Sequence, residues 1–287
     1  MDDCVERARE RAESGGLTLV HPFDDPLVIR GQGGVGVELL EDVPDLARVL
    51  VPLGGGGLAA GIAIAVKSAK PDVEVVGVQV AACASYPASL EKGHPVTVKP
   101  TRTVADGIAV KRPGEVTMPL IQRWLDEVVV VSDDEVGDAM AELLAEAKLV
   151  VEGAGAVGLA ALATGRVQPA ADGATAVVLS GGNVDETVLA AVARRSATRH
   201  GRGAVLFTTI SDRPGARARR LAAVASAGAS IVDVRHVREV VNLHVAETGI
   251  ELILDTRDPE HTRQIVEDLS AAGYTVRRQH TTERSEE

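Results

Sequence analysis

The feature that most constrains the fold is a strand–loop–helix segment at Arg48–Lys67, with the sequence RVLVPLGGGGLAAGIAIAVK. The apolar run Val49–Leu53 predicts a buried parallel strand, and an Ala- and Ile-rich helix is expected from Leu58 to Lys67. Between them lie four glycines, Gly54–Gly57. A loop without side chains can bring several backbone N–H groups to one anion, and a helix start adds partial positive charge. The segment therefore predicts a phosphate-binding loop, with a tight structural turn as the alternative; its glycine spacing matches neither a dinucleotide nor a Walker site.

The composition narrows the class of protein. Apolar residues make up 45% of the 287 residues but aromatic residues only 2%, so the core must consist mainly of Val, Leu, Ile and Ala. A net charge of −11 argues against nucleic-acid and anionic-membrane partners. The two cysteines suggest neither a disulfide framework nor a metal site, and the sequence has no membrane-length apolar run and no signal-peptide pattern. We therefore expect a soluble cytoplasmic protein.

Strand and helix patterns alternate through residues 1–195, which predicts an α/β domain with a parallel sheet covered on both faces. The expected strands are Leu17–His21, Val49–Leu53, Val73–Gln79, Val128–Val131 and Ala174–Ser180. The expected helices are Asp2–Ala12, one opened by Gly31–Gly34, Leu58–Lys67, Pro119–Leu125, and Asp133–Lys148 with Ser132 as its N-cap. A small-residue loop, Glu152–Ala156, should open one more helix. The segment Cys83–Gly107 contains three prolines and is expected to be less regular.

A polar, basic stretch at Arg194–Gly203 marks a domain boundary, with residues 196–202 as a linker rather than a nucleic-acid contact. Beyond it the pattern predicts a βαββαβ order, which is ferredoxin-like. Its expected strands are Ala204–Thr209, Ser230–Arg238, Val241–Leu254 and Tyr274–Arg278. Its expected helices follow the turn Asp212–Gly215 up to Ala227 and span Pro259–Ala272. Residues 282–287 should form a disordered tail.

Six short motifs in the first domain together indicate a family. They are HPFDDP at His21–Pro26, GQG at Gly31–Gly33, PLGGGGLAAG at Pro52–Gly61, ADG at Ala105–Gly107, VEGAGA at Val151–Ala156 and SGGN at Ser180–Asn183. In this order they resemble the threonine/serine dehydratases (ammonia-lyases), which are fold-type II pyridoxal-phosphate enzymes. Residues 1–195 resemble the later part of that catalytic domain, which is tryptophan synthase beta-like, and residues 203–281 resemble an ACT regulatory domain. The resemblance implies an incomplete doubly wound parallel sheet followed by a ferredoxin-like ACT unit.

The resemblance also implies a cofactor, a reaction and site residues. Gly54, Gly55, Gly56 and Gly57 with Leu58 would cradle the phosphate of pyridoxal 5'-phosphate, and Ser180 would face its pyridine nitrogen, unless Ser180 only caps its strand. Glu152 and Gly153 would line the active site, although an acid at a helix start is as readily a dipole partner. Asn183 would orient the SGGN loop or cap a helix starting at Val184. The expected reaction is β-elimination from threonine or serine, giving a 2-oxo acid and ammonia.

The Schiff-base lysine of the family belongs to a motif that precedes Met1, so we expect this chain to lack its catalytic base. The resemblance places no catalytic residue within the chain, and it leaves open whether the chain is active alone. None of the six lysines stands in the context of the family motif, and the first two and the last are expected to be solvated helix residues: Lys67, Lys70, Lys92, Lys99, Lys111 and Lys148. The alternative is a non-catalytic, amino-acid-binding regulatory protein derived from a dehydratase. A threonine synthase or sulfhydrylase is a weaker alternative, because the ACT unit and the HPFDDP and GQG motifs point away from it.

Two further expectations follow from the resemblance. The cation site of the related serine racemases has carboxylates at positions that fall here on Gln79 and Ser85, which are neutral, so we expect no metal site. The ACT unit should bind an amino-acid effector at Asp212, Arg213 and Gly215, although a turn of that composition also forms for structural reasons. The ACT and catalytic domains should also pair in a homo-oligomer.

Overall fold

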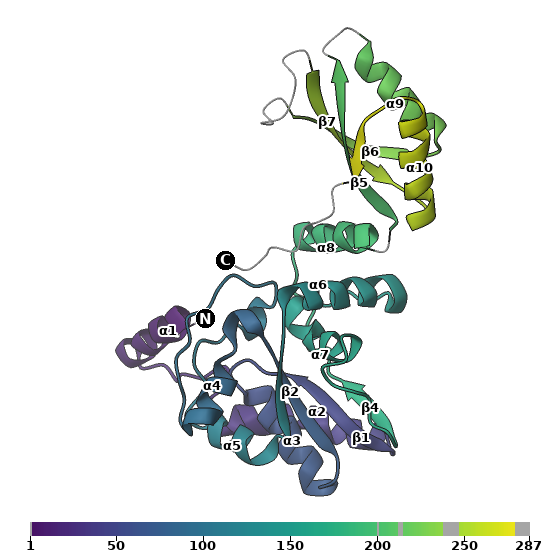
Figure 1. Ribbon diagram of the computed structural model, residues 1–287. Helices are drawn as coiled ribbons and strands as arrows, with labels where there is room; N and C mark the ends of the chain where they lie inside the picture. The colour runs from purple at the N-terminus through teal and green to yellow at the C-terminus, as the bar shows by residue number, and fades with distance from the viewer. Residues whose placement is uncertain (1, 200, 212–214, 238–246, 279–287) are drawn as a thin grey trace. The chain divides into compact units, whose positions relative to one another are not determined.

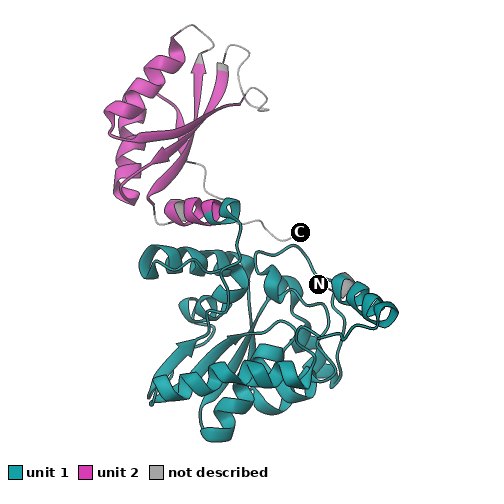
Figure 2. Ribbon diagram, turned by 180° about the vertical axis from the view of Figure 1, so that it is seen from behind, with its two compact units in different colours: residues 1–189 teal, residues 190–287 magenta. Residues whose placement is uncertain are grey.

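The computed structural model describes residues 2–199, 201–211, 215–237 and 247–278. The chain divides into two compact units, residues 1–189 and residues 190–287, which Figure 2 shows in teal and magenta. The division lies before the predicted Arg194–Gly203 boundary. The basic residues of that stretch up to Arg199 belong to a helix, α8 (Glu186–Arg199), and not to an open linker. None of the helices in the described ranges has both the length and the apolar character that a membrane span needs.

The first unit is built around a four-stranded parallel sheet with the strand order β3-β2-β1-β4 (Figure 1). The strands are β1 (Leu46–Pro52), β2 (Glu74–Val80), β3 (Glu127–Val131) and β4 (Ala174–Val177). The helices are α1 (Asp2–Gly15), α2 (Pro26–Asp42), α3 (Gly57–Ala69), α4 (Ser85–Lys92), α5 (Thr117–Trp124), α6 (Asp133–Glu142) and α7 (Gly153–Ala163). The predicted α/β class with a parallel sheet is confirmed.

The two faces of β1 pack against different helices, because successive side chains of a strand point to opposite faces. Val49, Val51 and Leu53 are fully buried in one cluster with residues of α2, α3 and α5. Leu50 faces the other way, where α7 approaches closely enough that a Cβ at Gly158 would lie 3.5 Å from the Leu50 Cβ. Helices therefore cover both faces of the sheet, as a run of consecutive apolar residues in β1 requires.

The GQG motif does not open a helix, which corrects the sequence prediction. Helix α2 begins earlier, at Pro26, where Asp25 accepts hydrogen bonds from the N–H groups of Leu27 and Val28. Gly33 lies inside α2 where α3 packs against it at very short range, whereas a Cβ at Gly31 would meet no atom within 4 Å. A Cβ at Gly61 of α3 would stand 2.4 Å from the Ile29 carbonyl oxygen, and one at Gly33 would stand 3.2 Å from the Gly61 carbonyl oxygen. Here glycine serves close helix packing rather than a helix start.

Another sequence prediction was wrong. Residues Leu17–His21 form no strand, and the side chains of Leu17 and Val20 are exposed. The segment Cys83–Gly107 is less regular, as expected, although it contains α4. Its proline, Pro87, lies in the first turn of α4, where a missing N–H removes no helical hydrogen bond.

Helix α6 starts as predicted, and with the π-helical turn after it the helical segment reaches Ala147, one residue before the predicted end. Ser132 and Glu135 form a reciprocal capping box, in which Glu135 accepts from the Ser132 N–H at 2.6 Å. Arg166 also pairs with the Glu135 carboxylate at 2.8 Å. Burial would raise the pKa of Glu135, but the hydrogen bonds from Ser132 and Arg166 hold that pKa below its ordinary value. The helix ends at Glu142 and is followed by a π-helical turn, η3 (Leu143–Ala147).

The second unit has the predicted βαββαβ order, with an antiparallel sheet of strand order β6-β7-β5-β8. Its elements are β5 (Gly203–Ser211), α9 (Ala216–Ser226), β6 (Ser230–Val237), β7 (Glu247–Asp255), α10 (Pro259–Ala271) and β8 (Val276–Arg278). Val224 of α9 and Ile265 of α10 pack with Leu206, Ile250 and Leu252, so both helices cover one face of the sheet. The predicted effector residues Asp212 and Arg213 and the predicted tail 282–287 lie outside the described residues, whereas Gly215 is the N-cap of α9.

Candidate functional site

The glycine loop lies where the sequence predicted it, between the carboxyl end of β1 and the start of α3. Gly56 is the N-cap of α3, with a φ of 100°, and has no side chain that could accept a hydrogen bond from the helix. The first-turn N–H groups of a helix have no acceptor within the helix. Those of Gly57 and Leu58 thus stand at the positive end of α3, as an anion-binding loop requires.

Each loop glycine is also required by its surroundings. A Cβ at Gly55 would lie 2.3 Å from the Phe23 ring, and one at Gly56 would lie 2.1 Å from the Tyr86 hydroxyl. One at Gly57 would lie 2.9 Å from the Phe23 carbonyl oxygen, and one at Gly54 would lie 3.1 Å from the Ile108 Cα. The run of four glycines therefore has a packing explanation, and the same backbone is compatible with the predicted anion binding.

Two buried hydroxyl groups hold the loop backbone in place. The Gly55 carbonyl accepts hydrogen bonds from the Tyr86 hydroxyl at 3.0 Å and from the Thr117 Oγ1 at 2.7 Å. Tyr86 is placed in turn by Gln79, whose side-chain oxygen accepts from the Tyr86 N–H at 2.9 Å. Burial raises the pKa of the Tyr86 phenol well above its ordinary value, so the phenol stays protonated and donates. These two donors fix the direction of the Gly55 carbonyl and with it the peptide plane of the loop.

The HPFDDP motif supports the same region, through contacts that sequence reasoning missed. The His21 Nδ1 accepts from the Asp24 N–H at 2.8 Å and closes a tight turn. The Asp24 carboxylate accepts from the N–H groups of Val116 and Thr117 at 2.9 and 3.0 Å and from that of Glu115 at 2.9 Å. A carboxylate at the start of α5 is favoured by the helix dipole. Asp24 therefore fixes the segment that carries Thr117 to the loop that carries Phe23.

The VEGAGA, SGGN and ADG motifs meet at the same end of the sheet. Because β1 and β4 are adjacent parallel strands, the loops that follow them emerge at one edge. Glu152 precedes α7, and its N–H donates to the Gly181 carbonyl at 3.0 Å. A Cβ at Gly181 would lie 2.2 Å from the Glu152 Oε1, and one at Gly107 would lie 3.5 Å from that same oxygen.

The Glu152 carboxylate therefore lies between two loops, and within residues 2–199 its side chain makes no capping bond to α7. Ile108 directly follows Gly107, and a Cβ at Gly54 would lie 3.1 Å from the Ile108 Cα. The glycine loop is therefore next to the loops that surround Glu152.

The remaining predicted site residues lie on the SGGN loop and at its neighbour. β4 ends at Val177, earlier than predicted, so Ser180 and Asn183 stand on an exposed loop beyond the strand. Helix α8 begins at Glu186, so Asn183 does not cap a helix at Val184. Gly153 opens α7, where a Cβ would lie 2.2 Å from the Val104 carbonyl oxygen. The structure thus brings Gly153 and the SGGN loop to the sheet edge that carries the glycine loop.

Two of the lysines and the two neutral positions of the expected cation site have partners within the first unit. Lys67 forms a partly exposed ion pair of 2.7 Å with Asp126, and Lys70 donates to the Pro44 carbonyl at 2.6 Å. Gln79 is fully buried and donates to the Leu53 carbonyl at 3.1 Å. Ser85 is also fully buried and donates to the Val110 carbonyl at 3.1 Å.

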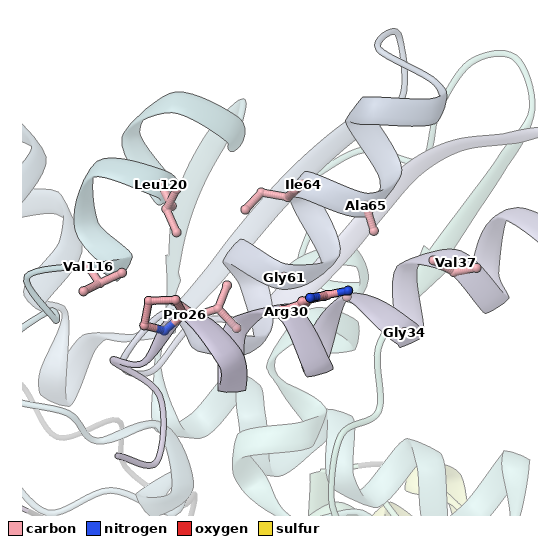
Figure 3. Close-up of a pocket in the computed structure, with 11 residues that line it drawn as sticks. Pro26, Arg30, Gly34, Val37, Gly61, Ile64, Ala65, Val116 and Leu120 are labelled. Atoms are coloured by element: carbon pink, nitrogen blue, oxygen red, sulfur yellow. The ribbon is translucent and has the colours of Figure 1, made fainter. Parts of the chain in front are cut away.

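An apolar groove of about 400 Å³ lies elsewhere, on the outer side of α2 and α3 (Figure 3). Its lining comes from α2, α3 and the start of α5, and Arg30 is its charged residue. It includes no residue of the glycine loop or of the SGGN loop, and Glu152 does not line it. The groove is therefore a separate feature from the site at the sheet edge.

Comparisons with known proteins agree with the motifs. Residues 1–182 match the family model described as pyridoxal-phosphate dependent enzyme. An L-threonine ammonia-lyase of Geobacter sulfurreducens is 45% identical over 275 residues, covering 96% of this chain and 68% of that protein. One from Thermotoga maritima is 42% identical with the same coverage.

Among solved structures, the processed form of threonine deaminase isoform 2 from Solanum lycopersicum is 35% identical, with a TM-score of 0.60. That match covers 64% of this chain and 54% of the solved one. The chain thus spans about two thirds of the length of the two ammonia-lyases and about half the length of the solved deaminase.

Proposed function

Because this chain belongs to the pyridoxal-phosphate-dependent enzyme family, we propose that it serves the deamination of L-threonine, L-serine or both to a 2-oxo acid and ammonia. The observation that carries the proposal is the glycine loop at the start of α3, with its carbonyl held by Tyr86 and Thr117. The names of the relatives, L-threonine ammonia-lyase, support the choice of substrate class.

The residues present fit the phosphate of the cofactor. Gly54–Gly57 leave no room for a Cβ, and the N–H groups of Gly57 and Leu58 lie at the positive helix end. These residues would hold the phosphate. The bound cofactor supplies an electron sink for the pair of electrons that remains when the α-proton of the amino acid is removed.

The residues at the sheet edge would contact the parts of the cofactor other than its phosphate. Ser180 would offer a hydroxyl to the pyridine nitrogen, and a hydroxyl leaves that nitrogen less firmly protonated than a carboxylate does. Glu152, between the Gly107 and Gly181 positions, would place a carboxylate at the mouth of α7. Asn183 and Gly153 would line the same edge.

The α-proton needs a base, which in this family is the lysine that also binds the cofactor. The proposal assigns that role to none of the six lysines of this chain. The base would then come from a further segment of the enzyme, whether on the same polypeptide or on another.

The second unit would be an ACT regulatory domain that binds an amino-acid effector and pairs with a second copy. Its βαββαβ order supports this, together with the left-handed Gly215 at the start of α9, where φ is 84°. Asp212 and Arg213 would complete the effector contact.

The test uses the purified 287-residue chain with pyridoxal phosphate, and pyridoxal as the ligand that lacks the phosphate. We expect the chain to bind pyridoxal phosphate at least about tenfold more tightly than pyridoxal, without a borohydride-reducible adduct and without 2-oxo acid release from threonine or serine. A reducible adduct with turnover would show that one of the six lysines is the base. Equal affinity for the two ligands would refute the phosphate site itself.

A further inference from the structure

A single buried amide side chain links the end of β2 to the glycine loop and to α4. Gln79 is fully buried and is followed by Val80, the last residue of β2. Its Nε2 donates to the Leu53 carbonyl at 3.1 Å, and Leu53 is the residue immediately before the four glycines. The Leu53 N–H donates to the Val78 carbonyl at 2.9 Å. Both backbone polar groups of Leu53 are therefore held from β2.

The oxygen of the same amide acts on α4. The Gln79 Oε1 accepts from the Tyr86 N–H at 2.9 Å. This N–H belongs to the first turn of α4 and has no acceptor within the helix, and the N-cap residue Ala84 makes no side-chain capping bond. Gln79 thus caps α4 from another element, and it holds the helix end from which the Tyr86 hydroxyl donates to the Gly55 carbonyl.

The two contacts require one donor and one acceptor on the same side chain. The Leu53 carbonyl can only accept and the Tyr86 N–H can only donate, so the partners also fix the orientation of the amide. An apolar side chain would leave both groups buried and unpaired, and an ionised carboxylate would set an oxygen against the Leu53 carbonyl. A protonated carboxylic acid, by contrast, has one O–H donor and one acceptor oxygen, as the two contacts require.

We propose that Gln79 is a positioning residue for cofactor binding, because its amide sets the glycine-loop backbone at Leu53 and, through Tyr86, at Gly55. The N–H groups at the start of α3 are thereby held in the direction that a phosphate needs. The inference rests on the phosphate site of the proposed function and adds a residue of β2 to it. Gln79 acts on the ligand only through the loop. Its loss should therefore change the preference for a phosphorylated ligand, which a purely structural role would leave unchanged.

The test compares the full chain with Gln79→Glu, Gln79→Met and Ser85→Ala. Ser85 is the matched control because it is also fully buried and donates to a carbonyl outside the glycine loop, that of Val110 at 3.1 Å. For each protein the affinities for pyridoxal phosphate and for pyridoxal are measured over about pH 5.5–8.5. The amide NMR signals of Gly54–Leu58 are recorded without ligand over the same range. Each affinity is expressed relative to the parent at the same pH, which removes the titration of the ligand phosphate.

In Gln79→Met we expect the affinity for pyridoxal phosphate to fall at least about tenfold, with the loop signals displaced and the affinity for pyridoxal nearly unchanged. Gln79→Glu should show the same loss at the alkaline end and recover towards acid pH. The reason is that burial raises the pKa of a carboxyl, and its protonated form can again donate to the Leu53 carbonyl. The recovery is measured within one protein, so it tests the proposal even if Gln79→Met does not fold. Ser85→Ala should lose stability but keep the affinity for pyridoxal phosphate.

The proposal is overturned if Gln79→Glu binds pyridoxal phosphate at a pH-independent ratio to the parent, or if a folded Gln79→Met keeps the parent's affinity. It is also overturned if Ser85→Ala weakens binding as much as the Gln79 variants do. In these cases a parent that prefers pyridoxal phosphate to pyridoxal leaves the proposed function standing. A parent without that preference refutes the phosphate site itself, and the positioning role falls with it.

Discussion

The two hydroxyl groups on the Gly55 carbonyl should be energetically coupled. In Tyr86→Phe the carbonyl keeps the Thr117 bond of 2.7 Å, and in Thr117→Val it keeps the Tyr86 bond of 3.0 Å. Each single change therefore removes hydrogen bonds but leaves the carbonyl with a donor, which should lower the free energy of unfolding by about 1 kcal/mol. The double change leaves a buried carbonyl with neither donor, a further loss of about 1–3 kcal/mol. The double variant should thus lose more stability than the sum of the two single variants.

The assay is denaturant unfolding of the parent, both single variants and the double variant, followed by a pyridoxal phosphate titration of each. The double variant should also bind the ligand most weakly, because the loop N–H groups lose their fixed direction. Ser89→Ala is the control: this buried hydroxyl of α4 accepts from the Val96 N–H at 2.9 Å, so its loss should reduce stability without weakening ligand binding. Additivity within about 0.5 kcal/mol, with unchanged affinity in all three loop variants, would refute this account of the loop.

Denaturant unfolding of three further variants tests the contacts that hold the first unit together. Asp24→Asn should lower the free energy of unfolding by about 1–3 kcal/mol, because an amide cannot accept from all three N–H groups. Asp25→Asn should change the free energy of unfolding little, since asparagine is an equally good N-cap, and equal losses in the two variants would contradict this. Gly61→Ala should lower the free energy of unfolding by about 3 kcal/mol or more, because the new Cβ forces α2 and α3 apart. Gly34→Ala is the control: its Cβ would have no atom within 4 Å, so the change should be neutral or stabilising by up to about 1 kcal/mol. An unchanged stability in Gly61→Ala would refute the close packing of the two helices. Because the folded-state pKa of Glu135 is lowered, the stability that its carboxylate contributes is complete above the unfolded-state pKa of about 4.3 and is lost as the pH falls through the folded-state pKa. The free energy of unfolding of Glu135→Gln should therefore fall less steeply with decreasing pH than that of the parent. An identical fall in the two proteins would count against the Glu135 assignment.

The elements that could be predicted from the sequence are those whose signals lie within one short stretch of residues. The glycine loop combines an apolar strand, four glycines and an alanine-rich helix in one stretch, and the strands β1, β2 and β3 contain short apolar runs rich in valine. The same locality explains the capping box at Ser132. The family followed from the order of six motifs, each of which is weak alone.

Contacts between distant segments could not be predicted in this way. Asp24 accepts hydrogen bonds at a helix start 93 residues later, and nothing in the residues around it indicates the partner. The contact of Tyr86 and Thr117 could not be predicted either, because the two residues come from different helices and meet at the Gly55 carbonyl of the glycine loop. The GQG motif was predicted at a helix start, and only the structure shows that its Gly33 lies inside α2, where Gly61 of α3 approaches it. The roles of Ser180, Glu152 and Asn183 remain predictions from the family resemblance.

The central claim is that the first turn of α3 holds a phosphate. The most direct measurement is an amide NMR titration of the full chain with pyridoxal phosphate, and with pyridoxal as the control. The account predicts that pyridoxal phosphate shifts the amide signals of Gly54–Leu58 in a saturable way and that pyridoxal leaves them in place. Saturable binding without movement of these signals, or equal movement with both ligands, would contradict it.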